Sequence, residues 1–258
     1  MIRVHYHTIS EPTINHSSTY YSYDDFTRTF DESRYAIDMF IIDSPESEED
    51  FQKFLPPLGT YFPETECLTI QYRLGRITLE LPKLHRNTIK FVTYGITISN
   101  IDDILPSELL RLELVHGTYM FTPTLPQHLV SLNMRDNEIF ALPHQFPETL
   151  KMLVLSNNHI QSLPSLPEGL ETLYVDYNGL RSLPQMPPSI VSLYVQSNGI
   201  YHLPTLPHSL IEFNCEDNCI GRFPVNFPEY IEVLQTEGNP DDVPPETFER
   251  LEYLERHT

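Results

Sequence analysis

The amino-acid sequence predicts an α/β repeat solenoid with a parallel β-sheet along one face. Three observations support this prediction. A block of 20 or 21 residues recurs along the second half of the chain, asparagine returns at one position of the block, and Pro outnumbers Gly by 23 to 9. Because Pro interrupts helices and central strands, a backbone with so many prolines fits a regularly turning chain better than long helices.

Residues 1–66 precede the regular repeats, and we expect them to form a partly helical N-terminal cap. Ser47 and Asp50 resemble a helix-capping pair, and Phe51, Phe54 and Leu55 fall on one helical face. An aromatic cluster lies upstream and comprises Tyr20, Tyr21, Tyr23, Phe26 and Phe30. The alternative for residues 1–20 is a flexible targeting tail.

The repeat array is expected over residues 67–240, and its frame from Leu129 to Tyr230 is LxxLxVxxNxLxxLPxxPxx. The frame asparagines are separated by 21, 20, 20, 20 and 21 residues, and they are Asn137, Asn158, Asn178, Asn198, Asn218 and Asn239. Residues 89–108 and 109–128 fit the same frame with Thr97 and Gly117 in place of Asn, and a weaker copy begins near Cys67. Such regular spacing is typical of stacked structural repeats.

Each position of the frame has a structural role. In one copy, Leu170, Leu173 and Val175 alternate along a short strand and should point into the core. Asn178 follows, and its amide can bond backbone groups left unpaired where the chain leaves the strand, so the six asparagines should form a structural ladder. The LPxxP half should be extended and polyproline-like, because Pro lacks an N–H donor.

Residues 241–258 are expected to form a C-terminal capping helix. The segment contains Phe248, Leu251 and Leu254 at helical spacing, after a start rich in Pro and acidic residues. The alternative is that the chain is the N-terminal part of a longer protein.

Charge and cysteine content restrict the classes of partner. The net charge of −20 would repel nucleic acid and anionic membranes, so we expect neither as a partner. No stretch is apolar and long enough to span a bilayer, and the N-terminus lacks the apolar run of a secretory signal. Cys67, Cys215 and Cys219 are too few for a disulfide framework and should remain free thiols.

We expect no cofactor and no metal, because the sequence carries no phosphate-binding loop and no zinc-type ligand spacing. The Cys215 and Cys219 pair has no second pair of ligands nearby, and His5 and His7 fit a surface strand better than a metal site.

The segment LPSLPEGLETLYVDYNGL (163–180) closely resembles the repeats of secreted leucine-rich-repeat effectors of bacterial pathogens, of the YopM and IpaH type. The resemblance covers about residues 89–240. It implies a right-handed leucine-rich-repeat solenoid with the parallel sheet on its concave face, an extended convex side and a helical N-terminal cap. It also implies delivery into the host cell cytoplasm and binding of host proteins.

Members of the IpaH type also carry a ubiquitin-ligase domain whose nucleophilic cysteine lies in a CxD motif, and we expect this chain to lack that domain. Cys215, Glu216 and Asp217 match the motif. However, Cys215 occupies the inward position equivalent to Val175 and Val195, so we interpret it as part of the core and expect no catalytic residue.

The outward strand positions predict the protein-binding surface. We expect a partner to dock over Tyr174 and Tyr194 and to bring a basic patch toward Asp176, Glu216 and Glu237. The full set comprises Asn133, Arg135, Val154, Tyr174, Asp176, Tyr194, Gln196, Asn214, Glu216 and Glu237. The alternative is that Tyr is only a good strand residue and that the acidic residues only maintain solubility.

The sequence therefore predicts a non-enzymatic protein–protein interaction module, secreted as an effector that binds a host protein. Two alternatives stay open. The chain is either the substrate-recognition part of a longer E3 ubiquitin ligase, or a cytoplasmic scaffold in the cell that produces it.

Overall fold

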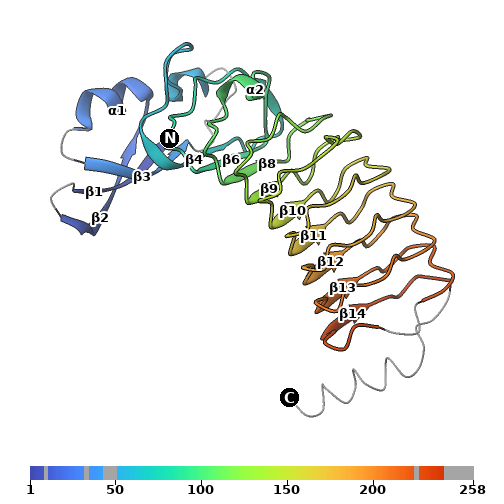
Figure 1. Cartoon of the computed structure of the whole chain (residues 1–258). Coiled ribbons are helices and arrows are strands. Elements are labelled where there is room, and N and C mark those ends of the chain that lie inside the picture. Colours follow the sequence, from blue (N-terminus) through green and yellow to red (C-terminus); the bar gives the residue numbers. More distant parts are fainter. Residues whose placement is uncertain (9–10, 32–34, 43–50, 224–226, 241–258) are drawn as a thin grey trace. The chain divides into compact units, whose positions relative to one another are not determined.

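The structure is a computed structural model that describes residues 1–240 except 9–10, 32–34, 43–50 and 224–226 (Figure 1). The expected helix over 241–258 and the pair Ser47 and Asp50 lie outside the described residues. The chain divides into two compact units, one over residues 1–119 and 123–129, the other over 120–122 and 130–258.

The first unit contains a mixed sheet in the strand order β8-β6-β4-β3-β1-β2. The strands of this sheet are β1 (Ile2–Thr8), β2 (Glu11–Tyr20), β3 (Tyr35–Ile42), β4 (Thr65–Gln71), β6 (Lys90–Tyr94) and β8 (Arg111–Val115). β1 is antiparallel to both β2 and β3, whereas β3, β4, β6 and β8 run parallel. A smaller parallel pair joins β5 (Ile77–Leu79) to β7 (Ile96–Ile98).

The helices found among the described residues of the first unit are short. They are α1 (Tyr23–Thr29), the 3-10 helix η1 (Phe51–Phe54) and α2 (Ile101–Ile104). Ser22 caps α1 by accepting a hydrogen bond from the Asp25 backbone N–H at 3.0 Å. The side chains of Phe51, Phe54 and Leu55 are buried, as their spacing indicated. Pro56 and Pro57 follow directly, so the helix ends at Phe54.

About half of the described residues before Thr65 lie in strands β1, β2 and β3, which the sequence analysis did not anticipate. Strands β1 and β2 pair antiparallel with each other, in the region for which a flexible tail was the alternative. His5 and His7 lie in β1, as expected of a strand. Three members of the aromatic cluster pack around buried Phe26, whose ring lies 5.3 Å from Tyr20, 5.9 Å from Tyr23 and 5.2 Å from Phe30, centroid to centroid. The fifth member, Tyr21, is exposed.

The second unit is a regular parallel solenoid, seen in Figure 1 as a ladder of short arrows. Its strands are β9 (Ser131–Asn133), β10 (Met152–Val154), β11 (Thr172–Tyr174), β12 (Ser192–Tyr194), β13 (Glu212–Asn214) and β14 (Val233–Gln235). Each strand pairs in parallel and without register shift with the strand of the next repeat. The proline-rich return segments described in this unit contain no helix.

The core of the second unit is built from one inward set of side chains per repeat. Leu170, Leu173, Val175 and Leu180 are fully buried, and the equivalent positions of the neighbouring repeats are buried as well. Burial of one such aliphatic side chain contributes about 1.5–3 kcal/mol, so the stacked repeats stabilise each other through this shared column. The leucine-rich-repeat solenoid that the sequence predicts is thus confirmed.

Candidate functional site: the outward face of strands β9 to β14

The ladder register places one outward residue of each strand beside the next. Each of these residues is the register partner of the next, in the order Asn133, Val154, Tyr174, Tyr194, Asn214 and Gln235. We call the surface formed by this central column and the residues flanking it the strand face. Parallel strands lie about 4.8 Å apart, so side chains in one column contact their neighbours directly.

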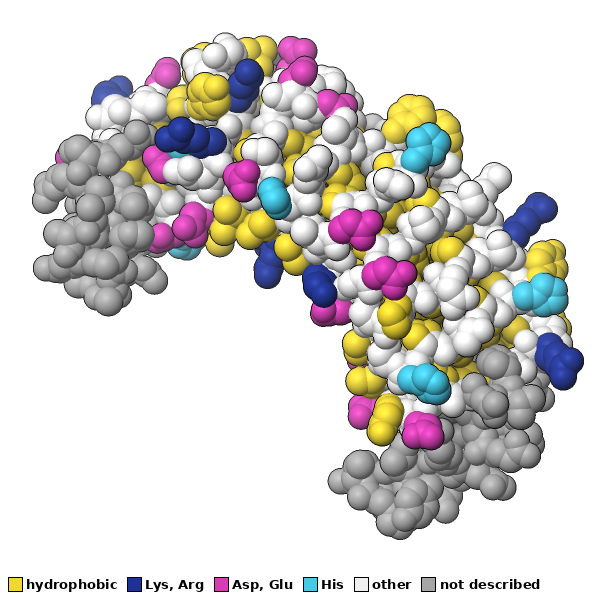
Figure 2. Space-filling model, viewed as in Figure 1, with side chains coloured by type: hydrophobic (Ala, Val, Ile, Leu, Met, Phe, Trp, Pro, Cys, Tyr) yellow, Lys and Arg dark blue, Asp and Glu magenta, His cyan; other side chains and the backbone are white. Residues whose placement is uncertain are grey.

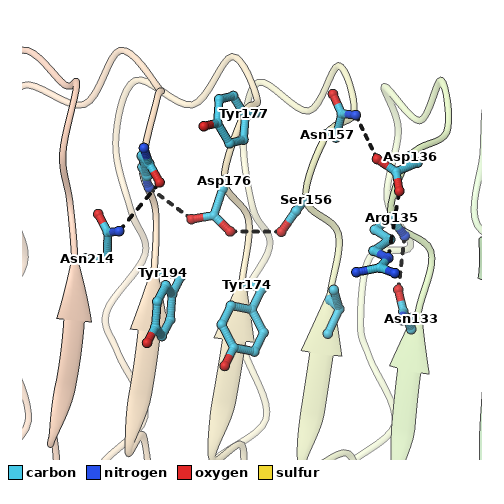
Figure 3. Close-up of a pocket in the computed structure, with 12 residues that line it drawn as sticks. Asn133, Arg135, Asp136, Ser156, Asn157, Tyr174, Asp176, Tyr177, Tyr194 and Asn214 are labelled. Carbon is cyan, nitrogen blue, oxygen red and sulfur yellow. Dashed lines mark hydrogen bonds and ion pairs between the residues drawn. The ribbon is translucent and has the colours of Figure 1, made fainter. Parts of the chain in front are cut away.

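The strand face contains a shallow groove of about 810 Å³ (Figure 3). Its lining comprises Asn133, Arg135, Asp136, Val154, Ser156, Asn157, Tyr174, Asp176, Tyr177, Tyr194, Gln196 and Asn214. Eight of these belong to the predicted binding set, whereas Glu216 and Glu237 of that set do not line the groove. The outward positions predicted from the sequence therefore include most of the residues that line the groove. They also include residues further along the solenoid, beyond the groove.

Tyr174 and Tyr194 lie at the middle of the groove. Their ring centroids are 4.6 Å apart and their planes are inclined by 42°. The Tyr194 hydroxyl donates a hydrogen bond to Glu212 Oε2 at 3.2 Å. Burial raises the pKa of both phenols, and the charges of Glu212 and Asp176 raise it further, so both rings remain neutral at physiological pH.

Asp176 lies beside the tyrosines and is held in place by two neutral donors. Its carboxylate accepts hydrogen bonds from the Ser156 hydroxyl at 2.9 Å and from the Gln196 backbone N–H at 3.1 Å (Figure 3). Burial raises the pKa of Asp176, and these two hydrogen bonds oppose the rise. The carboxylate is thus partly desolvated at the groove wall, and neither hydrogen-bond donor carries a charge.

Asn214 is buried and joins a polar network at the β13 end of the strand face. Its amide group donates to Gln235 Oε1 at 2.8 Å and to Glu216 Oε2 at 3.2 Å. Its Oδ1 accepts from the Glu216 backbone N–H at 3.0 Å. Asn214 and Glu216 therefore hydrogen-bond each other, whereas the exposed Glu237 lies beyond the groove.

Polar side chains also connect at the β9 end of the groove. The backbone N–H of Arg135 donates to Asn133 Oδ1 at 3.2 Å, and its guanidinium lies 3.7 Å from Asp136. Asn157 donates to Asp136 Oδ1 at 2.7 Å. Arg135, the cation at this end of the strand face, is thus paired with Asp136.

Four lining residues were missed by the sequence analysis: Asp136, Ser156, Asn157 and Tyr177. Three of them, Asp136, Asn157 and Tyr177, have left-handed backbones with φ of 60°, 59° and 51°. Strand alternation does not give the direction of side chains in such a turn. The available signal was their position, which directly precedes the frame asparagine in each repeat.

The frame asparagines connect successive repeats through backbone hydrogen bonds. Asn178 Oδ1 accepts from the Ile160 N–H at 2.9 Å, and its Nδ2 donates to the carbonyls of Leu155 at 3.0 Å and Val175 at 3.1 Å. Equivalent bonds to the preceding repeat are made by Asn158, Asn198, Asn218 and Asn239. This arrangement satisfies turn groups that would otherwise be unpaired in the core.

In the first unit, side chains other than asparagine accept hydrogen bonds from such backbone N–H groups. The Tyr119 hydroxyl accepts from the Ile98 N–H at 2.8 Å, and burial raises its pKa. Thr97 Oγ1 accepts from the Thr118 N–H at 2.7 Å. The repeats that lack Asn therefore still satisfy backbone donors through side chains of a neighbouring repeat.

The one motif that suggested catalysis lies in the core. Cys215 is fully buried and its pKa is raised, mainly by burial, which favours the unreactive thiol. Cys67 is half-buried with a raised pKa, and Cys219 is exposed. All three cysteines are free thiols.

The described residues hold no group of three or more His, Cys, Asp or Glu side chains arranged to bind a metal ion. Among the same residues, no helix is both long enough and apolar enough to cross a membrane. On the face seen in Figure 2, the described Lys and Arg side chains are scattered and form no continuous basic patch.

Comparison with known proteins gives structural matches. Neither a protein-family model nor a curated protein matches the sequence. YopM from Yersinia enterocolitica WA-314 has a TM-score of 0.61 and 28% identity, over 73% of this chain and 42% of that chain. YopM, a leucine-rich effector protein from Yersinia pestis, has a TM-score of 0.60 and 28% identity, over 69% of this chain and 51% of that chain.

A leucine-rich-repeat protein of Leptospira interrogans shares the fold at 18% identity, with a TM-score of 0.54 over 83% of this chain and 70% of that chain. This chain spans about half or less of the YopM chains that it matches. The strand register, the asparagine bonds and these matches agree. The chain is a leucine-rich-repeat protein that is structurally similar to YopM over most of its own length.

Proposed function

We propose that this chain is a non-enzymatic protein–protein interaction module whose strand face holds a partner protein. The observation that carries the proposal is the pair of contacting tyrosines, Tyr174 and Tyr194, at the middle of an open groove. Tyrosine supplies a large, amphipathic contact area with little side-chain entropy to lose, and it is enriched among the residues that dominate binding energy.

We further propose that the chain is a secreted effector that acts on a host protein in the host cell cytoplasm. The similarity to YopM, described as a leucine-rich effector protein, supports this role. We propose that the binding residues predicted from the sequence contact the partner. The central residues of this set line the groove, and Glu216 and Glu237 extend the acidic side beyond it.

Affinity capture tests the proposal. The full chain, the double variant Tyr174→Ala with Tyr194→Ala, and Tyr201→Ala as a control are immobilised and exposed to host-cell lysate. Tyr201 is an exposed tyrosine that does not line the groove. We expect the double variant to lose the captured partner by about 30-fold or more, as for truncated hot-spot residues. Equal recovery by all three proteins, each shown to be folded by circular dichroism, would contradict the proposal.

A further inference from the structure

Charge is distributed unevenly along the strand face. From β11 onward, its described outward positions carry the acidic residues Asp176, Glu212, Glu216 and Glu237 and no Lys or Arg. Arg135, at the β9 end, lies beside Asp136. The half of the face that contains the tyrosines is therefore negative, and it favours a partner of opposite charge.

The tyrosine pair lies between two of these carboxylates. Glu212 accepts the hydrogen bond of the Tyr194 hydroxyl on one side of the central column, and Asp176 lies in the neighbouring column on the other side. Both carboxylates are close enough to raise the pKa of both phenols. A cation placed over the rings would thus meet the negative faces of two aromatic rings and two carboxylates together.

Among biological cations, arginine matches this arrangement best. Its guanidinium is planar, stacks on aromatic faces, and directs its N–H groups sideways toward carboxylates in a fixed fork. A lysine ammonium is a strongly hydrated point charge and gains less from the ring faces. The groove is shallow and open, so it can accept an extended segment of a partner.

We propose that the partner contributes a basic segment and that one of its arginine side chains lies over Tyr174 and Tyr194, with Glu212 and Asp176 beside the guanidinium. This inference rests on the proposed function, because it assigns the chemistry of the partner at the same face. It makes the tyrosine pair a specificity determinant for arginine.

A peptide titration tests the inference with the full chain. The probes are three fluorescein-labelled 12-residue peptides in which Gly alternates with Arg, with Lys or with Gln, and binding is measured by fluorescence anisotropy at low salt. We expect the Arg peptide to bind more tightly than the Lys peptide and the Gln peptide to show no saturable binding. Binding of the Lys or the Gln peptide as tightly as the Arg peptide, or no binding of the Arg peptide, would overturn the inference.

Variants separate attraction to the ring face from simple apolar contact. Tyr174→Phe keeps the ring and should retain binding of the Arg peptide, whereas Tyr174→Leu should weaken it roughly 5- to 30-fold. Glu212→Gln combined with Asp176→Asn should weaken it as well. The controls are Tyr201→Ala, at an exposed tyrosine outside the groove, and Glu148→Gln, which removes one exposed carboxylate elsewhere.

The outcomes distinguish this inference from the proposed function. One outcome is that the double tyrosine variant loses the captured partner while Tyr174→Leu binds the Arg peptide as the wild type does. In that case the inference that an arginine lies over the tyrosine pair is wrong, and the proposal that the strand face binds a partner protein is retained. If the double variant keeps both the partner and the Arg peptide, both proposals are wrong. Loss of both, with the two controls unchanged, supports them together.

Discussion

The side-chain oxygen of Asn178 accepts a hydrogen bond from the backbone N–H of Ile160 at 2.9 Å and so closes a turn in the repeat before its own. The same bond is made by Asn158, Asn198, Asn218 and Asn239. The Asn178 amide also donates to the carbonyl of Leu155 in the preceding repeat at 3.0 Å. One side chain thus satisfies groups in two repeats. This geometry explains why Asn returns every 20 or 21 residues, since neither Asp nor a hydroxyl offers the same acceptor and two donors.

Substitution of Asn178 by Ala should destabilise the protein by about 2–3 kcal/mol. The change leaves the Ile160 N–H without its side-chain acceptor in the interior of the solenoid. It also removes one of the two asparagine donors from each of the carbonyls of Leu155 and Val175. Urea denaturation measures the free energy of unfolding, with Gln161→Ala at an exposed position as the control. A loss no larger than that of the control would show that the asparagine bonds do not stabilise the stack.

The left-handed turn before each frame asparagine predicts a stabilising substitution. Ser197 has φ of 51°, a conformation that costs a residue with a Cβ atom about 1 kcal/mol and that glycine adopts freely. Ser197→Gly should raise the free energy of unfolding by about 0.5–1 kcal/mol.

Ser192→Gly provides the matched comparison, because Ser192 lies in strand β12, where glycine weakens the strand. It should lower the free energy of unfolding. Equal effects of the two substitutions in urea denaturation would contradict the role assigned to the turn.

Asp176→Asn should increase stability at neutral pH while it weakens binding. Burial raises the pKa of Asp176 above its ordinary value of 3.8, so the unfolded chain ionises first as the pH rises. Between the two pKa values the native state binds more protons, and the stability of the wild type therefore falls with rising pH. Asn retains an acceptor for the Gln196 N–H and a donor for Ser156 without the buried charge.

Thermal unfolding of the wild type and Asp176→Asn over a pH series checks this prediction. The stability difference should be small below pH 3.8 and should grow as the pH rises toward neutrality. A variant that is less stable than the wild type at pH 7 would show that the two hydrogen bonds outweigh desolvation of the carboxylate.

The cysteines should differ sharply in reactivity in the folded protein. Cys219 is exposed, whereas Cys215 is fully buried and its raised pKa keeps it as the thiol. Under native conditions iodoacetamide should modify Cys219 first and should reach Cys215 only when the protein is unfolded in urea. Peptide mass spectrometry measures both sites. Modification of Cys215 as fast as Cys219 would remove the argument that this position belongs to the core.

The repeat array could be derived from the sequence because each position has one physical role. Asparagine spacing determines the period, strand alternation separates inward Leu173 from outward Tyr174, and the constant block length keeps successive strands in register. The tyrosine column followed directly from this register.

Other features depended on contacts outside the repeat. The pairing of β1 with β2 and β3 does not follow the repeat period. Much of the β2 sequence is polar, so alternating apolar residues did not indicate a strand there. At the site, the mutual hydrogen bonds of Asn214 and Glu216 turn two residues predicted to face a partner toward each other. Tyr177 lines the groove because of its left-handed turn, which alternation does not encode.

The central claim is that a partner protein contacts the strand face, and site-specific photo-cross-linking tests it most directly. A photoreactive phenylalanine analogue replaces Val154, which lines the groove, or Tyr201, which does not. Each full-length protein is irradiated with its captured partner, and the linked species are counted by mass spectrometry. Our account predicts a strong cross-link from position 154 and little from position 201. Cross-linking from position 201 without cross-linking from position 154 would contradict it.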